Sequence, residues 1–231
     1  MDKNSDFKIR AVVHAANEPW VPSPMPGVDR RMLDRIGDEV ARATSIVRYA
    51  PGSAFSAHTH TGGEEYLVLS GVFQDEHGDF PVGSYVRNPP QSSHTPSAAE
   101  GATILVKLWQ FDLDDRTAVT HHTADMSPEP VSGRPGVSII PLHKDVREAV
   151  RIEVWAPGAE IQIQAHTGLE VFVLEGSFTE ANELFEVDSW LRLPAGEDFA
   201  ATAGPVGTRV WIKSDHLAGP ITTPIASKEK I

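Results

Sequence analysis

Three histidines and a glutamate in this sequence are spaced like the ligands of one metal ion. His58 and His60 are separated by one residue, Glu64 follows a short glycine turn, and His94 comes later, after a pair of prolines. Residues i and i+2 of a β-strand face the same side, so we expect both imidazoles of the His-Thr-His stretch to enter one cavity. We therefore predict that one divalent metal ion per chain is held by His58, His60, Glu64 and His94.

The carboxylate of this ligand set has an alternative. Glu65 directly follows Glu64, and a turn that differs by one residue would bring Glu65 to the ion in its place. The residue types do not identify the metal, because imidazole suits zinc, iron, nickel and copper alike. The nearby acidic stretch 75–79 is expected to be a hairpin turn, since it lacks the spacing of a calcium-binding loop.

Short β-strands must position these residues. Glycine and proline, 18 of each, punctuate the chain into short segments. Residues 44–49, 66–69 and 103–109 are rich in β-branched, aromatic and other apolar side chains, which favours strands. Residues 31–40 and 142–150 are the segments where short helices are expected, if any form. The pattern predicts an all-β protein built as a sandwich or barrel.

The sequence repeats itself at a period of roughly 105 residues, which is an ordinary domain length. The clearest pairs are Tyr49-Ala50-Pro51-Gly52 with Trp155-Ala156-Pro157-Gly158, and Leu67-Val68-Leu69-Ser70-Gly71 with Phe172-Val173-Leu174-Glu175-Gly176. A proline-rich polar stretch near residue 127 separates the copies. We predict one domain at 1–126, which carries the metal site, and a second at 127–231.

The second copy has lost half of the ligand set. Its aligned positions are Gln164, His166, Glu170 and Phe199. Phenylalanine cannot bind a metal, so the second site is expected to be degenerate, with His166 and Glu170 as a buried hydrogen-bonded pair.

Composition excludes several classes of function. The chain has 231 residues, 32 acidic against 20 basic side chains, a formal charge of −12 and no cysteine. An acidic surface repels phosphate backbones, so we expect no nucleic-acid partner. The polar N-terminal residues lack the apolar core of a signal peptide, and no apolar run is long enough for a membrane helix. We expect a cytoplasmic protein with no membrane partner.

The metal motif resembles the two-part signature of the cupin family. Glycines lie at both ends of the first part, at Gly52 and Gly71, and the second part runs from Gly83 through Pro89 to His94. The resemblance implies two tandem cupin barrels, each a double-stranded β-helix or jelly roll.

A closer resemblance is carried by residues 64–76 and 81–90, which are similar to the cupin domain of the zinc anti-sigma factor ChrR. It implies zinc as the metal, with iron, nickel or manganese as alternatives, and it places the zinc ligands on His58, His60, Glu64 and His94. It also implies a sensor or regulator of small molecules or oxidative stress.

One part of the ChrR pattern is missing. Residues 1–40 are proline-rich, contain no cysteine and do not match the helical domain with which ChrR grips its sigma factor, so a sigma-factor partner is not expected. The alternative function is that of a non-haem iron dioxygenase acting on a small diketone or related carbonyl compound, because similar cupins include such enzymes. Catalytic residues are not identified, a small-molecule ligand near the metal is expected, and a homodimer is left open.

Overall fold

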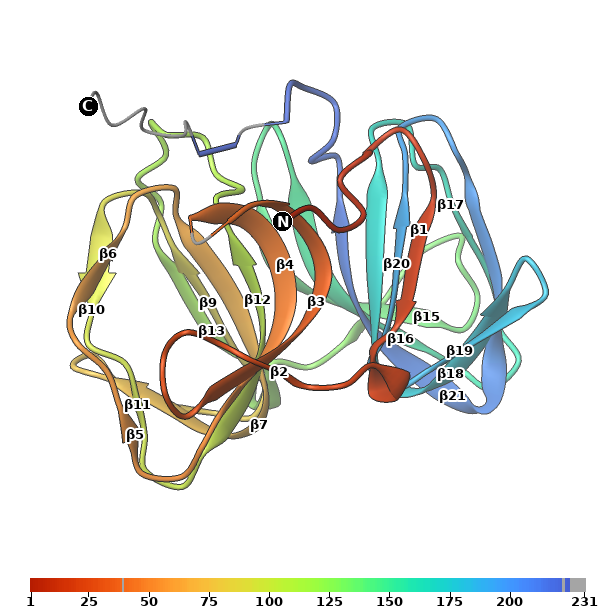
Figure 1. The fold of residues 1–231 in the computed structure, drawn as a ribbon. Helices are drawn as coiled ribbons and strands as arrows, with labels where there is room; N and C mark the ends of the chain where they lie inside the picture. The colour runs from red at the N-terminus through yellow and green to blue at the C-terminus, as the bar shows by residue number, and fades with distance from the viewer. Residues whose placement is uncertain (39, 222, 225–231) are drawn as a thin grey trace. The chain divides into compact units, whose positions relative to one another are not determined.

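The computed structural model describes residues 1–38, 40–221 and 223–224 (Figure 1). They form two compact units. Unit 1 contains Met1–Ser5, Trp20–His122 and the described residues after Pro220, and unit 2 contains Asp6–Pro19 and Thr123–Pro220. The chain is all-β, as predicted. Helical structure in these described residues is confined to two 3-10 turns, η1 (Ala15–Asn17) and η2 (Thr123–Asp125).

Unit 1 holds twelve of the strands found in the described residues. They are β2 (Val21–Pro22), β3 (Val28–Gly37), β4 (Ala41–Tyr49), β5 (Ser53–Ala54), β6 (His58–His60), β7 (Glu64–Asp75), β8 (Gly78–Pro81), β9 (Ser84–Asn88), β10 (Ser92–His94), β11 (Ser97–Ala98), β12 (Ala102–Leu108) and β13 (Val119–His122). The strands predicted at residues 44–49 and 66–69 are confirmed as parts of β4 and β7, and the one predicted at 103–109 is confirmed up to Leu108, where β12 ends.

Two sheets make up unit 1. The larger runs in the order β13-β9-β7-β12-β4-β3-β2, and β5, β8 and β11 extend it. The smaller contains only β6 and β10, which lie side by side in Figure 1. The interior is apolar and aromatic. Alternate residues of β7 enter it, so Tyr66 and Val68 pack there with Phe73 and Ile104.

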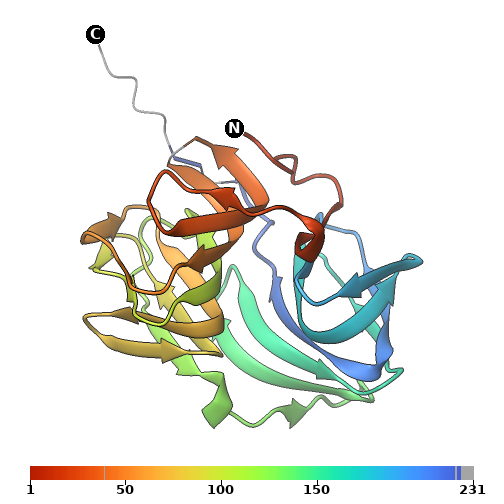
Figure 2. The ribbon, with the colours of Figure 1, turned by 60° about the horizontal axis from the view of Figure 1, so that its bottom comes forward.

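Unit 2 repeats much of this strand succession, and Figure 2 shows its strands from a second side. Its strands are β1 (Ala11–His14), β14 (Glu129–Pro130), β15 (Val137–Lys144), β16 (Ala149–Trp155), β17 (Glu160–Ile163), β18 (Leu169–Glu180), β19 (Glu183–Glu186), β20 (Ser189–Leu193) and β21 (Phe199–Ser214). They form one sheet in the order β1-β20-β18-β21-β16-β15-β14, with β17 on β21 and β19 on β18.

Neither of the two short helices considered from the sequence forms. Residues 31–40 lie mostly in β3, which pairs with β4 along its whole length, and backbone pairing there outweighs a weak helical period. Residues 142–150 form the β15–β16 hairpin. Its turn is closed by the Asp145 carboxylate, which accepts hydrogen bonds from the backbone N–H groups of Arg147 and Glu148.

The glycines of the repeated motif allow two segments of the backbone to cross at close distance. Gly71 lies in β7 at φ +70°, and a Cβ there would collide with the carbonyl oxygen of Gly101. Gly176 makes the same approach to the carbonyl of Gly207 in unit 2. Both units therefore need a residue without a side chain at this position, which explains why the glycine occurs in both copies of the sequence.

This crossing yields a prediction about stability. Gly71→Ala should destabilise the protein more than Gly52→Ala, because Gly52 has a similar φ of +76° but open space around its missing Cβ. The control should cost about 1–2 kcal/mol for the left-handed backbone alone. Gly71→Ala should cost about 1–3 kcal/mol more, from overpacking. Urea unfolding followed by circular dichroism measures both, and equal losses would contradict the steric explanation.

Candidate metal centre

The pairing of β6 with β10 brings the three predicted histidines together. The two strands are antiparallel, with His94 opposite His58 and Ser92 opposite His60. His58 and His60 point to the same side, as the spacing predicts. The three rings meet edge to face, with centroids 4.8 Å apart for His58–His60, 5.0 Å for His58–His94 and 4.8 Å for His60–His94.

The ring nitrogens are close enough to share one ion. One nitrogen from each ring lies within 4.8 Å of the other two, and the Nε2 atoms of His60 and His94 are 3.0 Å apart. Two nitrogens that each bind zinc at about 2.0–2.1 Å with tetrahedral angles would be separated by roughly 3.3–3.4 Å. Two lone pairs cannot face each other at this distance unless a proton or a cation lies between them. The three histidines therefore fit a divalent metal ion.

Glu64 lies beside two of the three histidines. Its Oε2 is 3.3 Å from His60 Nε2 and 3.7 Å from His94 Nε2. Asn88, opposite Glu64 in the β7–β9 pairing, donates to the same oxygen at 3.4 Å. Burial raises the pKa of the Glu64 carboxyl, and the charges of the neighbouring histidines oppose this rise. The arrangement is compatible with a fourth ligand, and that role remains a prediction.

Glu65 faces the opposite side of β7. Its Oε1 accepts a hydrogen bond from the Tyr85 hydroxyl at 2.5 Å, and the side chain is buried. Of the two carboxylates that the sequence leaves open, the geometry thus brings Glu64 to the histidines.

The site is buried on one side and open on the other. His60 and His94 are 9% and 3% exposed, whereas His58 lies on the surface. Burial, followed by the charge of His58, lowers the pKa of His60 to about 4. His60 is consequently neutral at neutral pH, which is the form that binds a metal ion.

Asp75 orients His94 and was not identified from the sequence. It ends β7, and its Oδ2 lies 3.1 Å from His94 Nδ1, with its side chain 3% exposed. A carboxylate that accepts from Nδ1–H leaves the Nε2 lone pair directed into the site. His58 is similarly oriented by the backbone carbonyl of Ser56, 3.2 Å from Nδ1. The sequence analysis treated residues 75–79 only as a hairpin turn, because nothing in the local pattern links Asp75 to His94.

Two aromatic rings fix the turn between His60 and Glu64. A Cβ on Gly62 would collide with the indole of Trp109, and one on Gly63 would collide with the ring of Phe111. The rings thus occupy the space that the glycines leave, and the turn is held against the main body of unit 1.

Tyr66 brings a polar group to the apolar interior near the site. It lies two residues after Glu64 on the same face of β7, and its hydroxyl is buried without a hydrogen-bond partner in the described part of the chain. Burial raises the pKa of the phenol far above its usual value, and the charges of Glu64 and Asp75 raise it further. The hydroxyl is therefore protonated, and it is available as a hydrogen-bond donor to a ligand.

The counterpart positions in unit 2 do not form such a group. His166 is exposed, so the predicted buried pair of His166 and Glu170 is wrong. Glu170 instead accepts hydrogen bonds from His216 Nε2 at 2.8 Å and from the indole N–H of Trp190 at 3.1 Å. Phe199 is buried in the apolar core of unit 2. In unit 2 the carboxylate at this position is therefore part of an internal hydrogen-bond network.

Comparison with solved structures shows the fold. A candidate dioxygenase from Nostoc punctiforme has a TM-score of 0.68 at 15% identity and covers 99% of this chain and 86% of its own. A candidate glyoxylate-induced protein from Pseudomonas aeruginosa has a TM-score of 0.69 at 16% identity and covers 89% and 87%. A pirin from Escherichia coli, solved with nickel(II), has a TM-score of 0.63 at 11% identity and covers 89% and 98%. No protein of curated function matches the sequence.

The fold is the cupin fold, and three clustered histidines lie within it. Residues 8–112 match the model of the family described as the ChrR cupin-like domain. The match includes all four predicted ligands and ends before the second repeat. None of the helices in the described residues is long and apolar enough to span a membrane.

The contact between Asp75 and His94 leads to a prediction. Asp75→Asn should lower metal affinity by about 10–100-fold, because the ring of His94 loses the carboxylate that orients it. Asp79→Asn is the matched control, since Asp79 is on the same hairpin but bonds to Gln74. Competition with a chromogenic chelator measures both affinities. Equal affinities for the two variants would show that Asp75 has no role in the site.

Proposed function

We propose that this protein binds one divalent metal ion in unit 1 and that this ion is zinc. We further propose that the protein acts as a metal-dependent sensor of a small molecule or of oxidative stress. The observation that carries the proposal is the group of three imidazoles within 4.8 Å of one another in a ChrR cupin-like domain. Glu64 completes the proposed ligand set.

The choice of zinc rests on the resemblance to the zinc anti-sigma factor ChrR, and the residue types are compatible with it. Three histidines and one carboxylate can fill a tetrahedral zinc site completely, which suits a structural or signalling role. Bound zinc would supply a fixed positive charge and a Lewis acid. The chain itself holds the ligands in place through Asp75, Ser56 and the glycine turn. The pirin solved with nickel(II) keeps nickel among the alternatives, together with iron and manganese.

Paired histidine variants test the single site. His60→Ala should remove most of the bound metal, while His166→Ala, the counterpart in the second repeat, should keep one equivalent. The β-sheet circular dichroism of His60→Ala should persist, because apolar cores in both units supply folding free energy without the metal. Elemental analysis of protein purified without added metal gives the metal content. Two equivalents that survive His60→Ala would overturn the proposal.

The second candidate function is that of a cupin dioxygenase for a small diketone or related carbonyl compound. Two observations favour it: His58 leaves the site open to solvent, and Tyr66 offers an unused donor in the interior. A ferrous ion with three histidines and one glutamate would keep two coordination positions for substrate and oxygen. The structural likeness to a candidate dioxygenase gives limited support, because it shows the fold alone.

Oxygen uptake separates the two functions. The protein is loaded with zinc or with ferrous iron and supplied with pentane-2,4-dione and related diketones. The sensor predicts no uptake above that of the metal-free protein with either metal. Uptake that requires iron and is lost in His60→Ala would establish the dioxygenase instead.

Tyr66 yields a further prediction that holds in either function. Tyr66→Phe should leave the metal content unchanged and weaken a small carbonyl ligand by roughly 2–10-fold, as expected for one neutral hydrogen bond. Binding is followed through the visible spectrum of the cobalt-substituted protein. Tyr85→Phe is the control, because its hydroxyl is already engaged by Glu65. Unchanged ligand affinity in Tyr66→Phe would show that the hydroxyl does not reach the ligand.

A further inference from the structure

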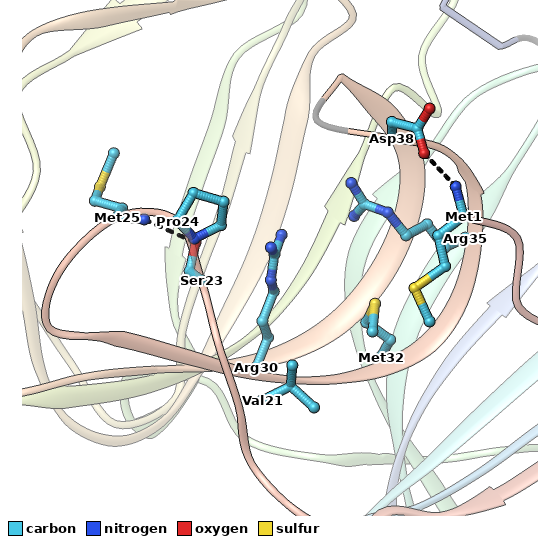
Figure 3. A pocket seen from close by; sticks show the side chains of 9 residues that line it. All are labelled: Met1, Val21, Ser23, Pro24, Met25, Arg30, Met32, Arg35 and Asp38. Atoms are coloured by element: carbon cyan, nitrogen blue, oxygen red, sulfur yellow. Dashed lines mark hydrogen bonds and ion pairs between the residues drawn. The ribbon is translucent and has the colours of Figure 1, made fainter.

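A second concave site lies in unit 1 on another set of residues. It is a pocket of about 600 Å³ formed around β3, within the range of about 300–1,000 Å³ that is typical of small-molecule sites. Figure 3 shows the guanidinium groups of Arg30 and Arg35 extending into it, with Met25 and Met32 to either side of Arg30. None of its lining residues is a predicted metal ligand.

A β-bulge creates this arrangement. Arg30 and Met32 lie on one face of β3 because they are two residues apart. Arg35 would fall on the other face of a regular strand, but the β3–β4 register shifts between Met32 and Asp34. The extra residue returns Arg35 to the face of Arg30, and redirecting a side chain is a common role of bulges beside functional sites.

The two arginines concentrate positive charge in a protein of net charge −12. Arg35 is only 6% exposed, and its Nε donates to the Gly37 carbonyl at 3.2 Å, which fixes the guanidinium beside the pocket. Burial, followed by the charge of Arg30, lowers the pKa of Arg35. The carboxylate lining the pocket, Asp38, is bound to the amino group of Met1.

The side chain of Arg30 has an unused hydrogen-bond donor. Its Nε is buried and has no hydrogen-bond partner within the described part of the chain. Leaving a buried donor of a charged group unsatisfied is costly, and an anion in the pocket would remove that cost. The planar guanidinium fork matches the two oxygens of a carboxylate.

The apolar residues that line the pocket indicate that the rest of the ligand is apolar. Met25, Met32 and Val21 present apolar surface, and methionine side chains adapt to irregular apolar shapes. We propose that this pocket binds an amphiphilic carboxylate, such as a medium-chain fatty acid, with its carboxylate on Arg30 and Arg35 and its hydrocarbon chain against the methionines.

The test is calorimetric titration with decanoate. Arg30→Gln should weaken binding by roughly ten- to a hundredfold, because a charge-assisted hydrogen bond is lost. Arg116→Gln is the matched control, since Arg116 lies in an exposed loop where it bonds to the carbonyl groups of Leu113 and Asp115. Decan-1-ol, which lacks the charge, and acetate, which lacks the chain, should both bind more weakly than decanoate.

A second variant keeps the test decisive if Arg30→Gln fails to fold. Met25 is 44% exposed, so Met25→Glu should fold normally while placing a negative charge at the pocket. It should also weaken decanoate. Chelator treatment should leave the wild-type affinity unchanged. The proposal is wrong if decanoate does not bind, or if both variants bind it like the wild type. It is also wrong if chelation abolishes binding, because the carboxylate is then bound by the metal.

Discussion

His58 lies opposite His94 because β6 and β10 form a separate antiparallel pair outside the large sheet of unit 1. Each strand has only three residues, so the pairing alone gives little stability. It is supported at both ends by contacts with the rest of the unit. Trp109 and Phe111 hold the glycine turn after His60, and Asp75 binds His94 from the end of β7. The candidate metal centre depends on these supports as much as on its ligands.

The two units share much of their strand succession, whereas the group of three histidines found in the described residues lies in unit 1. Gly71 and Gly176 make the same chain crossing, so the steric requirement of the fold persists in both copies. The interior has changed. Phe199 packs in the core of unit 2, and Glu170 is engaged by His216 and Trp190. In unit 2, aromatic packing and an internal hydrogen-bond network take the place of a ligand set.

The sequence predicts what depends on local spacing. The His-Thr-His stretch places two imidazoles on one side because β-strands alternate, and the β-branched runs predict the main strands. It does not predict partners that meet only through strand length or register. Asp75 reaches His94 because β7 continues for 12 residues, and Glu170 meets His216 from a segment beyond β21. The face occupied by Arg35 depends on a bulge that no residue type indicates.

The unequal exposure of the three histidines has a kinetic consequence. His60 and His94 are enclosed and held apart from water, while His58 lies at the surface. An ion arriving from solvent would meet His58 first, and an ion leaving would break that bond last. His58 would then govern how fast metal exchanges with the surroundings, and the enclosed pair would govern how tightly it is held. Exchange rate and affinity could therefore change independently in the course of evolution, through substitutions at or around different residues of the same site.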